Sequence, residues 1–165
     1  MNPNYVEETK LFREKLDKHF DPRLKVGEFH ILEARYPYKA HTDGVKGEYL
    51  LDDEHYGAWT LVIPLETVDS HTILFHQHSY DSKMIAPFIA QNPKLNAIDD
   101  DTYQKYFTHE VRDTMDYFSI EEIFPWKKGS CFAMSRYKWH TSDNFYPKGI
   151  IKRALIAWTV MPISA

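Results

Sequence analysis

The sequence predicts a mainly β fold, either a β-sandwich or a jelly-roll barrel, with a flanking N-terminal helix and a partly helical insertion. Aromatic residues are plentiful, with eleven Tyr, ten Phe and four Trp, and these residue types favour strands. Several short segments are rich in β-branched and aromatic residues and are bounded by Gly, Pro, Asp or Asn, which is typical of strands in an all-β protein. A single amphipathic segment precedes them and accounts for the helix.

The N-terminal segment has the features of a helix. Asn4 is followed three residues later by Glu7, a spacing typical of a capping box. Apolar residues then recur at roughly helical spacing, at Tyr5, Phe12, Leu16 and Phe20. Pro22 ends the helix because proline lacks a backbone donor and clashes with the preceding turn. We expect this helix to lie against the outside of a sheet.

Five later segments are expected to be strands. They are residues 27–38, 58–65, 72–77, 129–135 and 150–161. Side-chain alternation is clearest in the last of them. The segment from Gly129 to Trp139 is expected to be a strand, a turn and a second strand.

Residues 79–125 break the strand pattern. They contain prolines, an acidic run at residues 99–101 and helical patterns near residues 102–107 and 110–118. We interpret the stretch as an insertion of loops and short helices within a single domain that spans residues 1–165. Insertions of this size on a β scaffold often form lids or binding loops, and this one is expected to influence the choice of substrate.

Composition and charge exclude several classes of protein. A length of 165 residues fits one domain. The net charge of −4 and the dispersed Lys and Arg argue against nucleic-acid binding as the main role. The single cysteine, Cys131, excludes an internal disulfide and a cysteine zinc cluster. No apolar signal region or membrane-spanning stretch is visible, so a cytoplasmic protein is expected.

His41 and Asp43 are the first candidates for chemistry. In an extended segment, residues two apart point to the same face, so an imidazole and a carboxylate can converge on one metal ion. By itself the tripeptide carries little weight, because about 0.7 His-x-Asp pairs are expected by chance in a chain of this composition.

His140 and Arg153 give the pair a context. His140 follows the expected strand-turn-strand segment and can supply a third ligand. Two histidines and one carboxylate on one face of a metal leave sites open, as in non-haem iron(II) oxygenases. Arg153 lies within an apolar strand, where an arginine needs an anionic partner, and its planar fork suits a carboxylate. The order of these residues predicts a metal centre that works with an anionic co-substrate.

The same residues resemble a known family. His-x-Asp, a distal His and an Arg one strand later are similar to the iron(II)/2-oxoglutarate-dependent oxygenase superfamily, in its prolyl-hydroxylase-like branch. The likeness extends to the tyrosine-rich lead-in at residues 35–43, to WTLVIPL at residues 59–65, to the segment from Lys128 to His140 and to RALIAW at residues 153–158.

The resemblance implies a double-stranded β-helix and an oxidoreductase, specifically a dioxygenase that acts as a hydroxylase. Such enzymes couple oxidation of a substrate to decarboxylation of 2-oxoglutarate, which yields succinate and CO2. On that basis His41, Asp43 and His140 bind Fe(II), Arg153 pairs with the far carboxylate of 2-oxoglutarate, and Tyr36 contacts this co-substrate. The substrate stays open between a peptidyl residue, a free amino acid, a small metabolite and a modified base, as does the oligomeric state.

A second histidine pair leaves a rival interpretation open. His76 and His78 also share one face of a strand, as in a cupin-like jelly-roll that binds manganese, zinc or iron. A later carboxylate and a further histidine would have to complete that site, and Asp81 is the nearest carboxylate. Such a protein is an isomerase, a dioxygenase or a binding module without catalytic activity.

Overall fold

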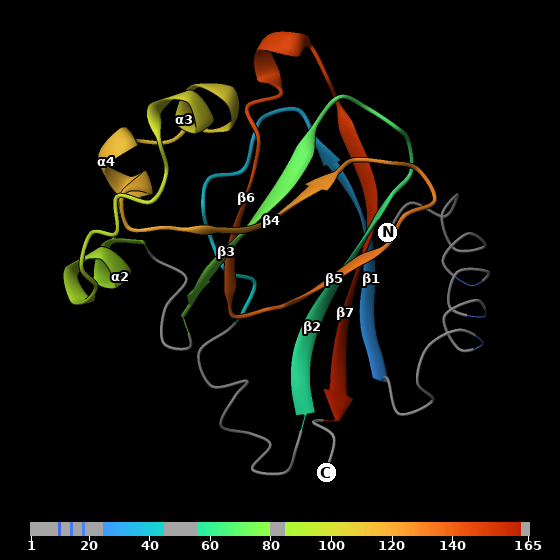
Figure 1. The fold of residues 1–165 in the computed structure, drawn as a ribbon. Helices are drawn as coiled ribbons and strands as arrows, with labels where there is room; N and C mark the ends of the chain where they lie inside the picture. Colours follow the sequence, from blue (N-terminus) through green and yellow to red (C-terminus); the bar gives the residue numbers. More distant parts are fainter. Residues whose placement is uncertain are drawn as a thin grey trace.

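The computed structural model describes residues 10, 14, 18, 25–44, 56–79 and 85–162, and the described chain is mainly β (Figure 1). Two antiparallel sheets account for its strands. Sheet A has the order β1 (Lys25–Ala34), β7 (Lys152–Pro162), β2 (Tyr56–Pro64) and β5 (Phe132–Ser135). Sheet B has the order β4 (Ile120–Pro125), β3 (His71–His78) and β6 (Lys138–Ser142). The chain passes repeatedly from one sheet to the other.

The strands agree largely with the pattern of the sequence. All five expected segments contain a strand, and β5 and β6 form the expected strand-turn-strand unit. The end of the expected insertion is different, because residues 120–125 form β4 and pair with β3. Exposed Glu121 and Glu122 interrupt its apolar residues, and the pairing contains an irregularity beside Leu74. Strand β4 therefore lacks the clean alternation on which sequence-based recognition depends.

Three α-helices lie among the described residues: α2 (Ile85–Gln91), α3 (Asp100–Tyr106) and α4 (Arg112–Met115), and a short 3-10 helix, η2 (Tyr146–Lys148), precedes β7. Helices α3 and α4 confirm two of the sequence predictions, whereas α2 was not predicted. Asp99 begins α3 by accepting a hydrogen bond from the Thr102 amide at 2.7 Å. Of the expected N-terminal helix, Lys10, Glu14 and Lys18 are helical and exposed, and its other residues lie outside the described residues.

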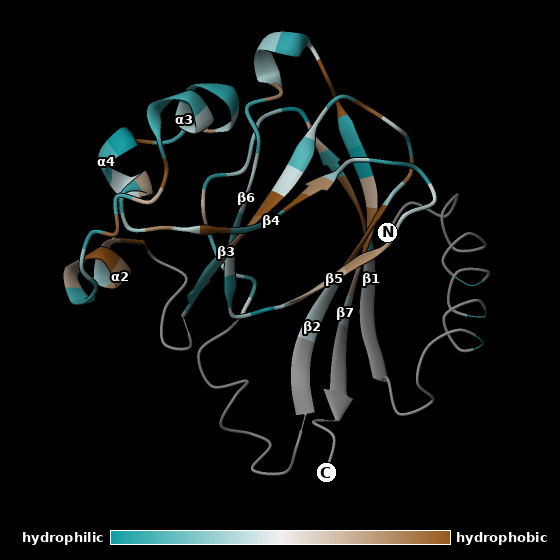
Figure 2. Cartoon of the chain, in the orientation of Figure 1, coloured by the Kyte–Doolittle hydropathy of each residue, from teal (hydrophilic) through white to brown (hydrophobic). Residues whose placement is uncertain are grey.

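The described residues pack into two hydrophobic clusters. One lies between the sheets and includes Val62, Leu74, Phe132 and Ile156. The other lies on the opposite side of sheet B, where the insertion covers it with Phe88, Phe107, Met115 and Phe118. Figure 2 shows the hydrophobic residues of α2 and β5, in contrast to the hydrophilic α3, which buries no residue.

The insertion therefore packs on the outer face of sheet B rather than over the space between the sheets. Alternation along β3 explains this arrangement, because Ile73 and Phe75 point to the insertion while Thr72 and Leu74 point the other way. The described part of the insertion is a second core layer. It does not form the lid that its length suggested.

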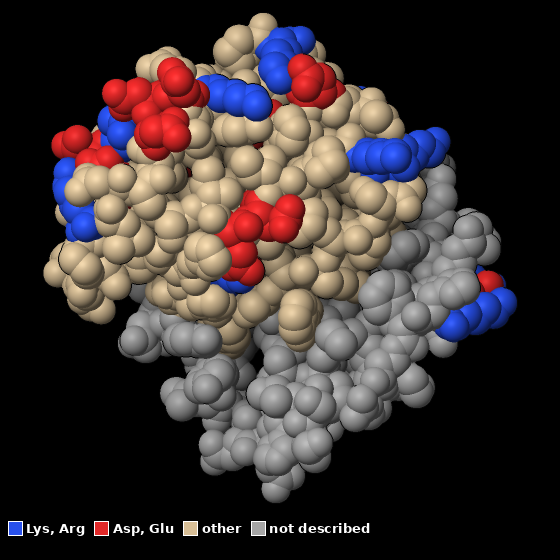
Figure 3. All heavy atoms as spheres, viewed as in Figure 1, with Lys and Arg blue, Asp and Glu red and all other residues tan. Residues whose placement is uncertain are grey.

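The surface agrees with the low net charge. Figure 3 shows Lys and Arg side chains dispersed over the visible face, with acidic side chains beside several of them. Among the described residues, no helix has the length and apolar character needed to cross a membrane.

Candidate metal centre

The structure brings His41, Asp43 and His140 together, as the sequence predicted. One donor atom from each lies within 4.8 Å of the others. His41 and His140 form an isolated antiparallel bridge in which each backbone amide donates to the other's carbonyl at 3.0 Å. Asp43 follows two residues after His41, so its side chain returns to the same face.

Both imidazoles are held in the same way. His41 Nδ1 lies 2.6 Å from the carbonyl oxygen of Lys39, and His140 Nδ1 lies 3.1 Å from that of Lys138. A carbonyl can only accept, so each Nδ1 carries the proton and each Nε2 keeps a free lone pair. Hydrogen bonds of this kind orient metal-binding histidines in proteins.

Asp43 lies between the two Nε2 atoms. Its carboxylate oxygens are 3.8 Å from His41 Nε2 and 3.8 Å from His140 Nε2, too long for hydrogen bonds. Bonds of about 2.0–2.2 Å to a shared metal, set at right angles, would place neighbouring donors about 3 Å apart. A small inward movement would complete the coordination. The Thr60 hydroxyl donates to Asp43 Oδ2 at 2.7 Å and orients the carboxylate.

The electrostatics favour a neutral imidazole at position 41. Burial, together with the neighbouring His140, lowers the pKa of His41 to about 4. Burial alone would raise the pKa of Asp43, but His140, the Thr60 hydroxyl and His41 outweigh it and lower that pKa. Near neutral pH the site therefore presents a free imidazole and a carboxylate, the forms that bind metals.

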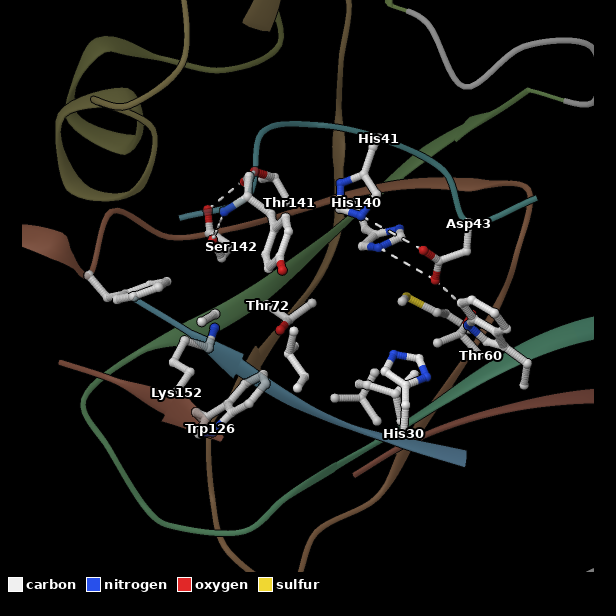
Figure 4. A pocket seen from close by; sticks show the side chains of 18 residues that line it. His30, His41, Asp43, Thr60, Thr72, Trp126, His140, Thr141, Ser142 and Lys152 are labelled. Carbon is white, nitrogen blue, oxygen red and sulfur yellow. Dashed lines mark hydrogen bonds and ion pairs between the residues drawn. The ribbon is translucent and has the colours of Figure 1, made fainter. Parts of the chain in front are cut away.

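A pocket of about 210 Å³ lies between the two sheets and includes all three residues. Figure 4 shows the three side chains together along one edge, with Lys152 and Trp126 away from them and His30 near the other end. The His30 and Trp158 rings meet edge to face there, with centroids 5.1 Å apart. From the candidate ligands the pocket therefore extends in two directions, toward Lys152 and Trp126 and toward His30.

Lys152 is the buried cation of this pocket. Only 2% of the residue is exposed, its ammonium donates to the carbonyl oxygen of His71 at 2.9 Å, and it lies 3.9 Å from the centre of the Trp126 ring. Among the described residues, no carboxylate lies within ion-pair distance of it. Burial lowers the pKa of Lys152 to about 7, although the charge of Asp143 opposes that shift. A buried ammonium in these surroundings favours an anionic ligand.

Arg153 does not point into the pocket, contrary to the sequence prediction. It is exposed and lies opposite Glu33 in the register of β1 and β7. Its Nε lies 3.0 Å from a Glu33 carboxylate oxygen and its Nη1 3.7 Å from one of Glu66. Neighbouring residues of a strand face opposite sides, so Lys152 faces the pocket and Arg153 faces away. The anionic partners that Arg153 requires are on the outside of the sheet.

Tyr36 also lies outside the pocket. Two thirds of the residue is exposed, and its ring stacks on that of Tyr146 with centroids 5.0 Å apart. The tyrosine that lines the pocket is Tyr38, whose ring lies 5.8 Å from that of His41. The prediction that Tyr36 contacts a co-substrate therefore lacks support from its position.

The rival histidine pair is not part of this site. His76 and His78 are exposed near the end of β3 and do not line the pocket. His76 Nδ1 lies 3.7 Å from a Glu121 carboxylate oxygen. No group of metal-binding side chains among the described residues includes either histidine, and Asp81 lies outside the described residues.

Several pocket residues were missed by the sequence interpretation. Lys152 was passed over in favour of its neighbour, and His30, an exposed residue of β1, was not assigned to the pocket. Alternation along β7 would have indicated Lys152, since it shares a face with the apolar Ala154 and Ile156. Thr60 carries no sequence signal, because its role depends on Asp43 reaching across from a separate segment.

Comparisons of this chain with protein-family models, curated proteins and solved structures found no match.

Proposed function

We propose that this protein is an iron(II)- and 2-oxoglutarate-dependent oxygenase that hydroxylates a second substrate. One observation carries the proposal: two histidines and an aspartate converge in a pocket that also buries an ammonium without a carboxylate partner among the described residues. The first group fits a metal with open coordination positions. The second fits the distant carboxylate of a ligand that also reaches the metal.

The fold supports the proposal. Strands β1, β2, β5 and β7 lie in one sheet and β3, β4 and β6 in the other, so the chain crosses between the sheets several times. The bridge between His41 and His140 adds one more strand position beside β6. Such alternation is what a jelly-roll, or double-stranded β-helix, requires, and such folds enclose ligands between their sheets.

The donor set fits iron(II). Imidazole and carboxylate donors suit this ion, and the arrangement of two histidines and one carboxylate occurs in non-haem iron oxygenases. Iron(II), when bound, couples the oxidation of a substrate by O2 to the decarboxylation of 2-oxoglutarate to succinate and CO2.

The protein's part is to bind and orient. Lys152 would pair with the far carboxylate of 2-oxoglutarate, in the role first expected of Arg153, while the His71 carbonyl and the Trp126 ring hold the ammonium in place. The other end of the pocket, beside His30 and Trp158, would receive the substrate. Apolar walls such as Val62 and Ile156 limit the entry of water.

An anaerobic titration tests the proposal. The purified protein is loaded with Fe(II) and then with 2-oxoglutarate, and the visible spectrum is recorded after each addition. We expect an absorption band that requires both components, and succinate formation once O2 is admitted. His140→Ala should lose the band because it lacks a ligand. Tight zinc or manganese binding without any such band would identify a metal-binding jelly-roll without oxygenase activity.

Two neighbouring residues of β7 provide a matched comparison. Lys152→Met should weaken 2-oxoglutarate binding at least 10-fold, because it removes the ammonium that would pair with the far carboxylate. Arg153→Met, which removes the ion pairs with Glu33 and Glu66 outside the pocket, should bind 2-oxoglutarate like the wild type. The reverse pattern would show that the anion is held on the other face of the strand.

A further inference from the structure

Glu110 connects the insertion to the candidate metal centre. It is a buried residue of the segment between α3 and α4, and its side chain is 3% exposed. Its Oε1 accepts a hydrogen bond from the Ala40 amide at 2.5 Å and lies 3.0 Å from the Thr141 hydroxyl. Ala40 immediately precedes His41, and Thr141 immediately follows His140. A single oxygen atom therefore contacts both strands that carry the histidines.

The antiparallel geometry explains why this contact is needed. His41 and His140 form a pair joined by two backbone hydrogen bonds. In such a ladder the next residue along turns its amide away from the partner strand. The Ala40 amide therefore points away from β6, in a place where the residue is buried. A buried amide without an acceptor is costly, and Glu110 is its acceptor.

Hydrogen bonds within the insertion orient the Glu110 backbone. The Glu110 amide donates to the Phe107 carbonyl at 2.8 Å, and the Tyr103 hydroxyl donates to the Glu110 carbonyl at 2.9 Å. Both partners belong to the hydrophobic cluster on the outer face of sheet B. Through Glu110, the insertion therefore contacts the two segments that carry His41 and His140.

We propose that Glu110 is a positioning residue of the metal centre: by accepting from Ala40 beside Thr141, it sets the spacing of the strands that carry His41 and His140, and so the metal affinity. The inference rests on the metal-binding part of the proposed function and is independent of 2-oxoglutarate. It also gives the insertion a role in metal binding.

Two conservative variants of Glu110 distinguish the effect of the position of its side-chain oxygen from the effect of its charge. Glu110→Gln keeps an oxygen at the same distance but removes the charge. Glu110→Asp keeps the charge but draws the carboxylate back by about 1.5 Å. Asp116→Asn is the matched control, because it breaks contacts with Lys94 and Arg112 within the insertion and leaves the ligand strands alone. The probe is Co(II), bound anaerobically to the metal-free protein and followed by its visible spectrum, with circular dichroism to establish folding.

We expect Glu110→Asp to weaken Co(II) binding by about 10-fold or more and to alter the Co(II) spectrum, as loss of outer hydrogen bonds does at other metal sites. Glu110→Gln and Asp116→Asn should bind Co(II) within about threefold of the wild type, each with an unchanged spectrum. Exchange of the Ala40 amide with solvent should be faster in Glu110→Asp alone.

Other outcomes overturn the inference. Wild-type affinity in Glu110→Asp would show that the contact does not position the ligands. A loss of Co(II) affinity in Glu110→Gln as large as that in Glu110→Asp would show that the position of the accepting oxygen does not by itself set the metal affinity. If the wild type itself binds no metal, the proposed function fails as well, whereas a wild type that binds Co(II) but not 2-oxoglutarate leaves this inference intact.

Discussion

At the scale of single residues, Lys152 is a buried cation surrounded by aromatic rings and a backbone carbonyl. Its ammonium lies against Trp126 and Phe145 and donates to the His71 carbonyl. Asp143 is the acidic residue whose charge acts on it, but that carboxylate is already engaged by the Ser70 hydroxyl and the His71 amide at 2.5 and 2.9 Å. With a pKa of about 7, the buried Lys152 side chain is therefore present in both its charged and its neutral form near neutral pH.

Anion binding at Lys152 should depend on pH. Burial lowers the pKa of the free group to about 7, and a bound carboxylate raises it. The affinity is then constant below that pKa and falls as the pH rises above it, because the ammonium must be regenerated. We expect 2-oxoglutarate affinity, measured calorimetrically on the metal-loaded protein, to fall roughly tenfold from pH 6 to pH 8.

Arginine provides the control for that pH dependence, because it stays charged throughout this range. Lys152→Arg should therefore bind 2-oxoglutarate with nearly equal affinity at pH 6 and pH 8. If this variant loses affinity as steeply as the wild type, the titrating group is elsewhere in the site.

At the scale of elements, the segment that carries Asp43 is held against the turn between β5 and β6. The Gly44 amide donates to the Arg136 carbonyl at 2.7 Å, and an Arg136 Nη2 donates to the Asp43 carbonyl at 3.2 Å. A Cβ on Gly44 would lie 2.5 Å from the Tyr137 ring. This ring is buried, so the close approach of segment and turn depends on the missing side chain.

Gly44→Ala should therefore disturb the metal centre through packing. The added methyl group would push the segment away from Tyr137 and move Asp43 with it. We expect a loss of about 1–3 kcal/mol in the free energy of unfolding, as in other overpacked sites, together with weaker metal binding. Thermal unfolding and metal titration measure the two effects.

Gly129→Ala is the matched control for this substitution. Nothing lies within 4 Å of a Cβ at Gly129, although its φ of +83° makes a side chain strained there. It should lower stability while leaving metal affinity unchanged. Equal metal affinities of the two variants and the wild type would mean that the position of Asp43 does not depend on this contact.

At the scale of the whole molecule, the candidate ligands join parts of the chain that are far apart in sequence. His41 and Asp43 follow β1, whereas His140 lies in β6, after the insertion. A metal bound to all three exists only when both sheets are in place. Binding and folding are therefore coupled.

Metal should consequently raise the unfolding temperature. At about 100 times its dissociation constant, a ligand specific for the native state adds about 2.7 kcal/mol. For a chain of this length that corresponds to roughly 5–10 °C, measured by calorimetry under anaerobic conditions with Fe(II) against a chelator. His140→Ala should show no such difference, and a wild type that melts at one temperature in both solutions would contradict the proposed ligand set.

The sequence by itself determined the three candidate ligands and most of the strands. His41 and Asp43 share a face because of the two-residue period of extended chain, a local property. The order of the segments then placed His140 within reach. Helix α3 was also recognisable, since Asp99 and Thr102 form a local cap. These features depend on residues near one another in the chain.

Only the tertiary structure decided which cation faces the pocket, where the insertion packs and what supports the ligands. Lys152 and Arg153 are adjacent in the chain. A shift of one residue in the register of β7 would turn the Arg153 side chain to the pocket and the Lys152 side chain to the outside. Glu110 contacts Ala40 and Thr141 only because the insertion lies on the outer face of sheet B. These contacts join segments that are distant in the sequence. Strand pairing and the packing of the insertion on sheet B bring those segments together, and no local pattern in the sequence encodes either.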